Sequence, residues 1–203
     1  MGKVERNNPG TRICILKEDG NATGDFMQGV IDAGIGLVER FSSPGETIPF
    51  SVNLVGSKTM SSNMQSELAH VSSILSSLGI TVNCILPGIT DMKGLEGASR
   101  ATVNLKLNPD VFSDKICRFL EDRYGMKTLE EPVRGGIDGT SRWVRCVARF
   151  FGCEERADMI IDGIKERFDR MMDGPRRILS GKTCCSCSTS WQATRWRALR
   201  CSS

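Results

Sequence analysis

The stretch FSVNLVG (Phe50–Gly56) decides the fold of this chain, because two further stretches repeat its pattern. These are TVNCILPG (Thr81–Gly88) and ATVNLKL (Ala101–Leu107). Each is rich in β-branched and apolar residues and stops at a Gly or just before a Pro, and amphipathic helical segments separate them. Alternating strands and helices predict an α/β fold with a parallel, Rossmann-like sheet and flanking helices. In such sheets ligands bind at the carboxyl ends of the strands, so we expect function in the loops after these stretches.

Composition narrows the class of protein. The chain has 203 residues, a net charge of +3 and 25% charged residues. This near balance argues against a dedicated nucleic-acid-binding protein, which would carry a strongly basic face. The sequence has no uninterrupted apolar stretch long enough to span a membrane, and its first residues lack the apolar core of a signal peptide. We therefore expect a cytoplasmic protein with no nucleic-acid or membrane partner.

Periodicity and capping residues locate the other elements. A strand is expected at Arg12–Leu16 and a very short one at Thr128–Leu129. The expected helices are Asp25–Phe41, Ser62–Leu78, a helix opened by Asn108-Pro109-Asp110 and ending at Tyr124, a short helix starting near Asp91, Ser141–Phe151 and Glu154 to about Asp173.

Local motifs give little specific chemistry. Gly56-Ser57-Lys58-Thr59 resembles the end of a phosphate-binding loop, but the first Gly is missing and Ser57 interrupts the Gly-Lys pair, so a strand-to-helix turn is favoured. His70 has no second histidine to join it in a metal site and is interpreted as a packed or surface residue. Glu130-Glu131 could serve acid–base chemistry or simply be solvated. No metal-ligand set is predicted.

The cysteines and the last residues form a separate problem. Five cysteines are scattered singly among mostly apolar neighbours, which favours buried reduced thiols. From Gly174 onward the sequence contains no Asp or Glu, and Cys184, Cys185 and Cys187 make only a weak metal-binding pattern. Cys and Ser codons in Thr183–Ser188, read one frame over, encode an apolar strand. Our hypothesis is that residues 183–203 are out of frame.

The order of the segments resembles the nitrogenase component 1 family, and most closely its α-type subunits. The resemblance covers roughly residues 10–182. The segments that carry it are Val52–Gly56, Leu78–Val82, Ala101–Leu105, Leu120–Gly125, Gly136–Thr140 and Arg177–Lys182. The family includes catalytic nitrogenase subunits, cofactor-assembly scaffolds, and nitrogenase-like reductases of tetrapyrroles and organic sulfur compounds.

This resemblance implies a plan of three Rossmann-like domains around a metallocluster or substrate pocket. On that plan, residues 1–47 are the end of a preceding α/β domain, residues 48–152 are the central domain, and residues 153–182 are a long helix leading towards a third domain. An iron–sulfur or related metallocluster is implied for the full complex. The implied partners are a homologous β-type subunit and an ATP-dependent iron–sulfur reductase.

Few site residues transfer by resemblance. Nitrogenase α-type subunits place a cofactor-ligating cysteine after the strand matching Val103–Leu105, whereas this chain has Asn108-Pro109 there and Cys117 only further on. Gln28 falls near a pocket histidine of nitrogenase. The pocket-lining residues implied by analogy are Gln28, Ser57, Lys58 and Asn108, with no metal ligand and no catalytic residue assigned.

These residues favour a fragment of the catalytic subunit of a nitrogenase-like reductase over a protein that reduces dinitrogen. Two alternatives stay open. One is a non-catalytic scaffold for metallocluster assembly, and the other is an inactive truncated product. The fragment is not expected to catalyse a reaction alone.

Overall fold

The computed structural model describes residues 6–7, 25–57, 63–133, 135–180, 183–186 and 197–200. The predicted strand Arg12–Leu16 therefore lies outside the described residues. The chain forms two compact units, Met1–Asp158 and Met159–Ser203, which are described separately below.

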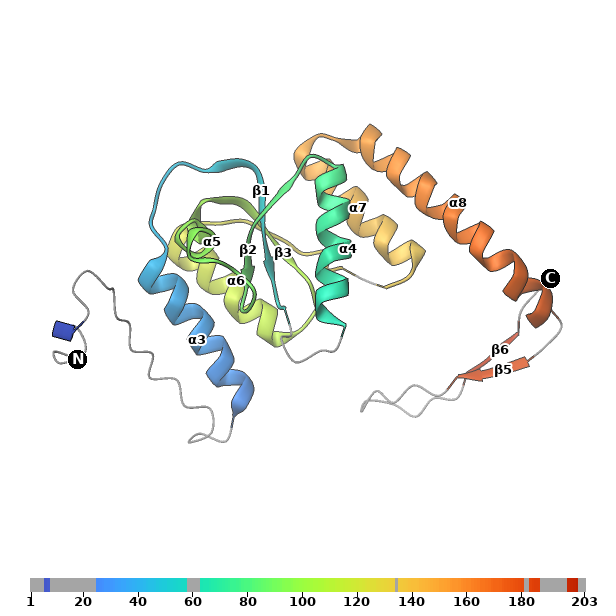
Figure 1. Ribbon diagram of the computed structural model, residues 1–203, viewed down its shortest axis with the longest axis horizontal. Helices are drawn as coiled ribbons and strands as arrows, with labels where there is room; N and C mark the ends of the chain where they lie inside the picture. Colours follow the sequence, from blue (N-terminus) through green and yellow to red (C-terminus); the bar gives the residue numbers. More distant parts are fainter. Residues whose placement is uncertain are drawn as a thin grey trace. The chain divides into compact units, whose positions relative to one another are not determined.

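The first unit is built on a parallel sheet of four strands, as the sequence predicts (Figure 1). The strands are β1 (Ile48–Val55), β2 (Thr81–Leu86), β3 (Ala101–Lys106) and β4 (Thr128–Leu129), in the spatial order β2-β1-β3-β4. Leu54 and Val55 are neighbours in β1 and point to opposite faces, yet both are fully buried. Burial on both faces explains why the central strands read as continuous apolar stretches.

One face of the sheet is covered by α3 (Phe26–Phe41), α5 (Met92–Glu96) and α6 (Val111–Tyr124) (Figure 1). The short η1 (Ala98–Arg100) leads from α5 into β3. Each of the three α-helices begins after an aspartate whose carboxylate accepts a hydrogen bond from the backbone N–H three residues later. Such caps satisfy backbone donors that the first helical turn leaves free. The buried side chains of this face include Ile31, Val38, Phe112, Ile116 and Leu120.

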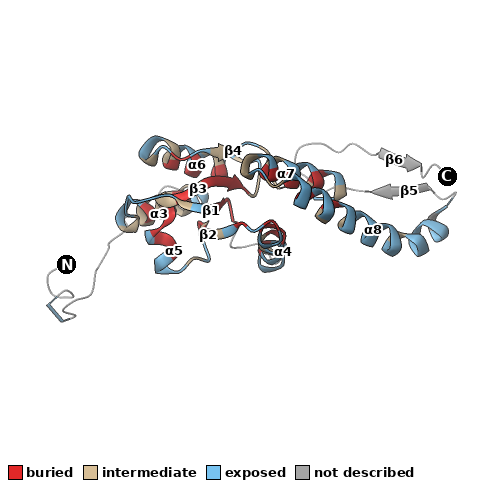
Figure 2. Ribbon diagram, turned by 90° about the horizontal axis from the view of Figure 1, so that it is seen from above, coloured by how far each residue is buried: buried red, intermediate tan, exposed pale blue. Residues whose placement is uncertain are grey.

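The other face is covered by α4 (Met64–Ser77) and α7 (Ile137–Phe151), whose inward sides are buried (Figure 2). The buried residues of α7 include Trp143, Val144 and Val147. This helix begins at Ile137 rather than at the predicted Ser141. Gly136, with φ of 81°, ends the extended segment before it, so Ile137–Thr140 already form the first turn.

A chain of amide side chains crosses the interior of the sheet. Asn53 of β1 donates from Nδ2 to Asn104 Oδ1 of β3 at 3.0 Å and to the Ala98 carbonyl at 2.7 Å. Asn83 of β2 donates to Asn53 Oδ1 at 2.9 Å and to the Gly97 carbonyl at 3.0 Å. Asn53 and Asn104 are fully buried, and these bonds satisfy the Asn53 amide and the Asn104 Oδ1, whereas the Asn104 Nδ2 is buried without a hydrogen-bond partner.

Helix α8 (Glu154–Leu179) begins in the first unit and continues through the second. It extends beyond the predicted end near Asp173 and runs through Pro175, which lacks the N–H that a helix interior normally uses. Strand β5 (Thr183–Ser186) pairs antiparallel with β6 (Arg197–Arg200). The out-of-frame origin of residues 183–203 stays a prediction. None of the described helices is long and apolar enough to cross a membrane.

Candidate functional site

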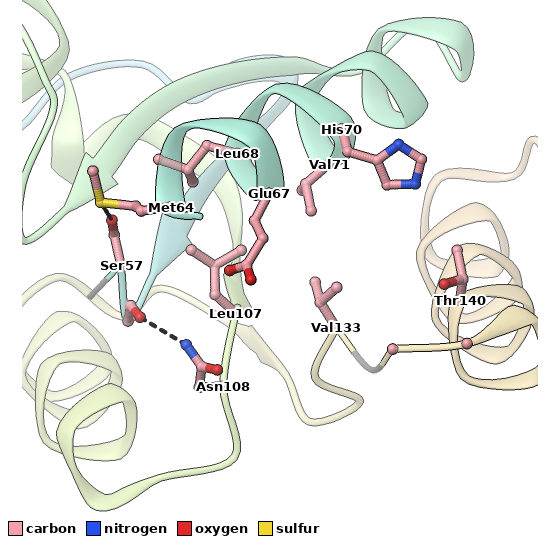
Figure 3. Close-up of a pocket in the computed structure, with 13 residues that line it drawn as sticks. Ser57, Met64, Glu67, Leu68, His70, Val71, Leu107, Asn108, Val133 and Thr140 are labelled. Atoms are coloured by element: carbon pink, nitrogen blue, oxygen red, sulfur yellow. Dashed lines mark hydrogen bonds between the residues drawn. The ribbon is translucent and has the colours of Figure 1, made fainter. Parts of the chain in front are cut away.

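A cavity of about 500 Å³ opens at the carboxyl ends of β1 and β3, where the strand pattern predicts function (Figure 3). The loop after β1, the loop after β3, one side of α4 and the segment leading into α7 all contribute to its wall. Its lining residues are Gly56, Ser57, Met64, Glu67, Leu68, His70, Val71, Leu107, Asn108, Val133, Gly135, Gly136 and Thr140.

The backbone at the end of β1 is fixed by a close approach to α6. Gly56 has φ of 96°, and a Cβ placed on it would lie 2.0 Å from the Ser113 hydroxyl oxygen. Its N–H donates to the Leu86 carbonyl at 2.8 Å, and its carbonyl accepts from Asn108 Nδ2 at 3.0 Å. Glycine is therefore required here for both its conformation and its size.

Ser57 and Asn108 are two of the four residues for which a pocket-lining role is expected, and the structure brings them together at this cavity. Ser57 is buried, and its hydroxyl donates to the Met64 sulfur of α4 at 3.2 Å. Lys58 lies outside the described residues, so its role stays a prediction.

Gln28 is not placed at this cavity. It lies on α3 and lines a separate groove of about 510 Å³ between α3 and α6. Its Nε2 donates to Asp32 Oδ1 at 2.5 Å, and its Oε1 accepts from Lys115. The pocket-lining role expected for Gln28 by analogy stays a prediction.

Two polar residues of α4 also line the cavity, which the sequence did not predict, although it does indicate that His70 is a packed or surface residue. Glu67 and His70 lie one turn apart on α4, and both are exposed. Figure 3 shows the Glu67 carboxylate directed towards Leu107 and Val133, with Thr140 of α7 across the cavity. A Glu three residues before a His places both on one helix face, which is the signal that could have found them.

Apolar side chains complete the lining. Leu68, Val71, Leu107 and Val133 present carbon surface beside the polar groups. A concave, mixed surface of this size suits an organic ligand with an apolar body and a few hydrogen-bonding groups.

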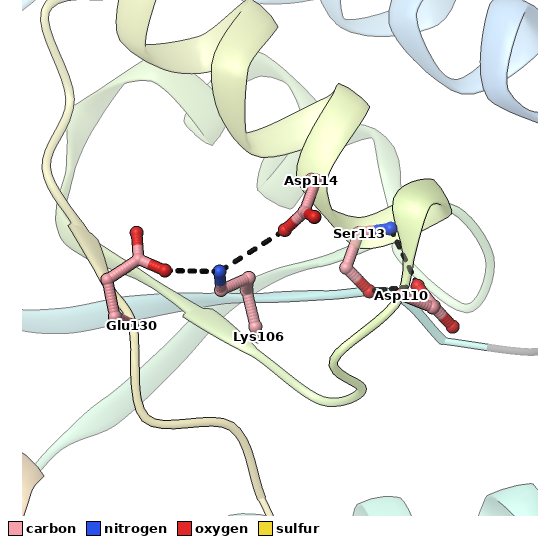
Figure 4. Close-up of polar contacts among 5 residues, drawn as sticks. All are labelled: Lys106, Asp110, Ser113, Asp114 and Glu130. Atoms are coloured by element: carbon pink, nitrogen blue, oxygen red, sulfur yellow. Dashed lines mark hydrogen bonds and ion pairs between the residues drawn. The ribbon is translucent and has the colours of Figure 1, made fainter.

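A buried lysine lies at the end of β3 (Figure 4). Lys106, the last residue of β3, places Nζ 2.6 Å from Glu130 Oε2 and 3.2 Å from Asp114 Oδ1. Burial alone would lower the pKa of Lys106, but hydrogen bonds to the two carboxylates and their charges raise the pKa above its usual value. Glu130, a candidate for acid–base chemistry or for simple solvation, is instead an exposed ion-pair partner of Lys106.

The described donors do not fit an iron–sulfur cluster held in this cavity. Such clusters are bound by cysteine thiolates, and none of the lining residues is a cysteine. Cys84 and Cys117 are free and buried elsewhere, and burial raises their pKa to about 11 and about 12, which disfavours the thiolate. No group of three His, Cys, Asp or Glu residues in the described part of the chain could hold a metal ion.

Two kinds of curated protein are among the relatives of this chain. The chain is 25% identical over 180 residues to a nitrogenase iron-molybdenum cofactor biosynthesis protein NifE of Methanococcus maripaludis, covering 86% of this chain and 36% of that protein. It is 32% identical over 111 residues to one subunit of the light-independent protochlorophyllide reductase of Pelodictyon phaeoclathratiforme, covering 54% and 20% respectively. The chain thus spans about a third or less of the length of these relatives.

A solved structure, nitrogenase Cp1 at pH 5, shares the fold with a TM-score of 0.64 at 20% identity. The match covers 77% of this chain and 32% of that one. In addition, the family described as nitrogenase component 1 type oxidoreductase matches residues 2–194, which is nearly the whole chain. The parallel sheet, the cavity at its carboxyl edge and this match agree, and the chain belongs to the nitrogenase component 1 type oxidoreductase family.

Proposed function

We propose that this chain is part of the catalytic subunit of a nitrogenase-like reductase. Its electrons would come from an ATP-dependent iron–sulfur reductase, and a homologous β-type subunit would complete the complex. The cavity at the ends of β1 and β3 carries the proposal, because it lies where parallel sheets bind ligands. Since the chain spans only 36% and 20% of the length of these two relatives, it would supply one wall of a larger pocket.

The donor set of this wall supports an organic substrate. Leu68, Val71 and Leu107 would contact an apolar body, while the polar side chains of Glu67, His70 and Asn108 lie beside them in the same lining. The relative that reduces protochlorophyllide acts on a molecule of this class. If the full complex holds a metallocluster, residues other than these would bind it, and the cluster would supply the electrons for the reduction.

The second candidate is a non-catalytic scaffold for metallocluster assembly. Its support is the relative named as a cofactor biosynthesis protein, which aligns with a larger share of this chain than the protochlorophyllide reductase does. A truncated, inactive product is the third possibility.

Protochlorophyllide is the probe that separates these candidates. We expect the full chain to bind it saturably in an absorbance titration under anaerobic conditions. Glu67→Trp fills the cavity from an exposed position and should weaken binding about tenfold, or 1.4 kcal/mol. Gln65→Trp, also exposed on α4 but outside the lining, is the matched control and should leave affinity unchanged.

Two outcomes would count against the reductase. If the chain binds no protochlorophyllide but retains iron and sulfide after anaerobic reconstitution, the scaffold is favoured. If it binds neither, the truncated product is favoured. Equal loss in the Glu67 and Gln65 variants would place the binding site elsewhere.

A further inference from the structure

The segment Glu130–Val133, called the wall segment here, connects β4 to one side of the cavity. Its last residue, Val133, lines the cavity directly. The Val133 N–H donates to the carbonyl of Lys106 at 3.2 Å. The downstream end of the wall segment is therefore attached to the last residue of β3.

The upstream end of the wall segment is attached to the same residue through its side chain. Lys106 Nζ lies 2.6 Å from the Glu130 carboxylate, as Figure 4 shows. Lys106 thus holds the wall segment at both ends, once through a charged side chain and once through its backbone. The Glu131–Arg142 pair, at 3.9 Å with a mostly exposed Arg142, is a long and weak ion pair.

Charge makes the side-chain contact selective. The Lys106 side chain is only 10% exposed, and a buried ammonium needs carboxylate partners. Asp114 of α6 and Glu130 both meet this need, but only Glu130 belongs to the wall segment. Both carboxylates therefore contact Lys106, but Glu130 connects this lysine to the wall segment, whereas Asp114 connects it to α6.

We infer that Lys106 is a positioning residue for the cavity, and that its ion pair with Glu130 fixes the wall segment whether or not a ligand is bound. The inference goes beyond the proposed function, because it concerns the shape of the empty site. It does not depend on the identity of the substrate.

Amide hydrogen exchange of the full chain tests this inference without any ligand. In Glu130→Ala, the Val133 amide should exchange roughly threefold to fivefold faster, the size expected for a pair with one exposed partner. Lys106→Met should give the same increase, and the double variant no more than either single one. Asp114→Ala also deletes a carboxylate partner of Lys106 and should leave Val133 unchanged.

The Leu107 amide separates local from global effects. It donates to the Val55 carbonyl at 2.8 Å just after β3 and should be unaffected in Glu130→Ala and Asp114→Ala, while in Lys106→Met its increase should be smaller than that of Val133. Equal acceleration of Val133 and Leu107 would mean that the pair acts only on overall stability, and the inference would be wrong. Equal acceleration of Val133 in the Glu130 and Asp114 variants would also overturn it. Because Glu130 is 82% exposed, its variant is not expected to unfold. A negative protochlorophyllide titration leaves these readouts intact, so the two tests fail independently.

Discussion

Two clusters of polar side chains in the first unit provide partners for their buried polar atoms in different ways. The asparagines of β1, β2 and β3 lie within the sheet, carry no charge and bond mainly to one another and to nearby carbonyls. Lys106 lies at the end of β3, is charged, and is paired with carboxylates that are 43% and 82% exposed. Two members of the first cluster, Asn53 and Asn104, are fully buried, whereas the second cluster reaches water through its carboxylate partners.

The difference indicates distinct roles. A buried amide chain is strongly dependent on each member, because losing one leaves the others without partners and without water. It therefore specifies which strands pair and in what register. An ion pair with an exposed partner can exchange one contact for solvent, so it can be altered at small cost and influences the local shape of the cavity.

The largest expected effect is at the centre of the amide chain. Asn53→Leu leaves Asn104 Oδ1 and the Ala98 carbonyl without their donor, and should lower the free energy of unfolding by about 3–5 kcal/mol. Urea denaturation measures this loss. Asn83→Leu, at a partly exposed position, should cost clearly less. Equal losses in both variants would show that the network has no centre.

The second-largest effect on stability is expected at the turn that follows β1. Gly56→Ala should lower the free energy of unfolding by about 2–3 kcal/mol, because the new methyl group meets Ser113 and the positive φ is strained. Gly135→Ala lines the same cavity but meets no atom within 4 Å, and serves as the control. Thermal denaturation measures the melting temperatures of the two variants. Equal melting temperatures would contradict the prediction.

The smallest effect is at Lys106. Its raised pKa means that the ion pair contributes stability below the ordinary lysine value of 10.5 and loses it as pH rises through the higher folded-state pKa. Lys106→Met should therefore cost about 1 kcal/mol near neutral pH, and the difference from wild type should shrink above about pH 10.5. Lys127→Met, an exposed position, should show no such alkaline change. A constant difference from about pH 9 to about pH 12 would contradict this prediction.

Local signals in the sequence predicted the elements well. The three β-branched stretches became β1, β2 and β3, and the helices predicted to start near Asp91 and Asp110 do so, whereas Asp25, predicted as part of its helix, is the cap of α3. These signals succeed because strand patterning and capping depend on neighbours in sequence. The amide chain also had a signal that was not used, since Val-Asn recurs in each stretch at residues 52–53, 82–83 and 103–104.

The position of the cavity at the carboxyl ends of the strands was predicted, but several of the residues that line it were not. Ser57 and Asn108, expected by analogy to line a pocket, do lie at the cavity, and their functional role stays a prediction. Val133 lies there because the chain continues from β4, which pairs with β3 through Asn104 and Thr128. The strand itself was predicted at Thr128–Leu129, but its pairing joins residues far apart in sequence, which local patterns do not reveal. Burial of Lys106 was equally hidden, because a lysine at a strand end is usually exposed.

Helix α8 has a chemical consequence of its own. Met159 and Met171 are each 69% exposed, whereas Met126 in the core of the first unit is 7% exposed. Exposed thioethers oxidise more readily than shielded ones, and a sulfoxide replaces an apolar group with a polar one. Oxidation in air would therefore modify the exposed methionines of α8 before it modifies Met126 in the core. The sulfoxide content of α8 would then measure how far the protein has been oxidised.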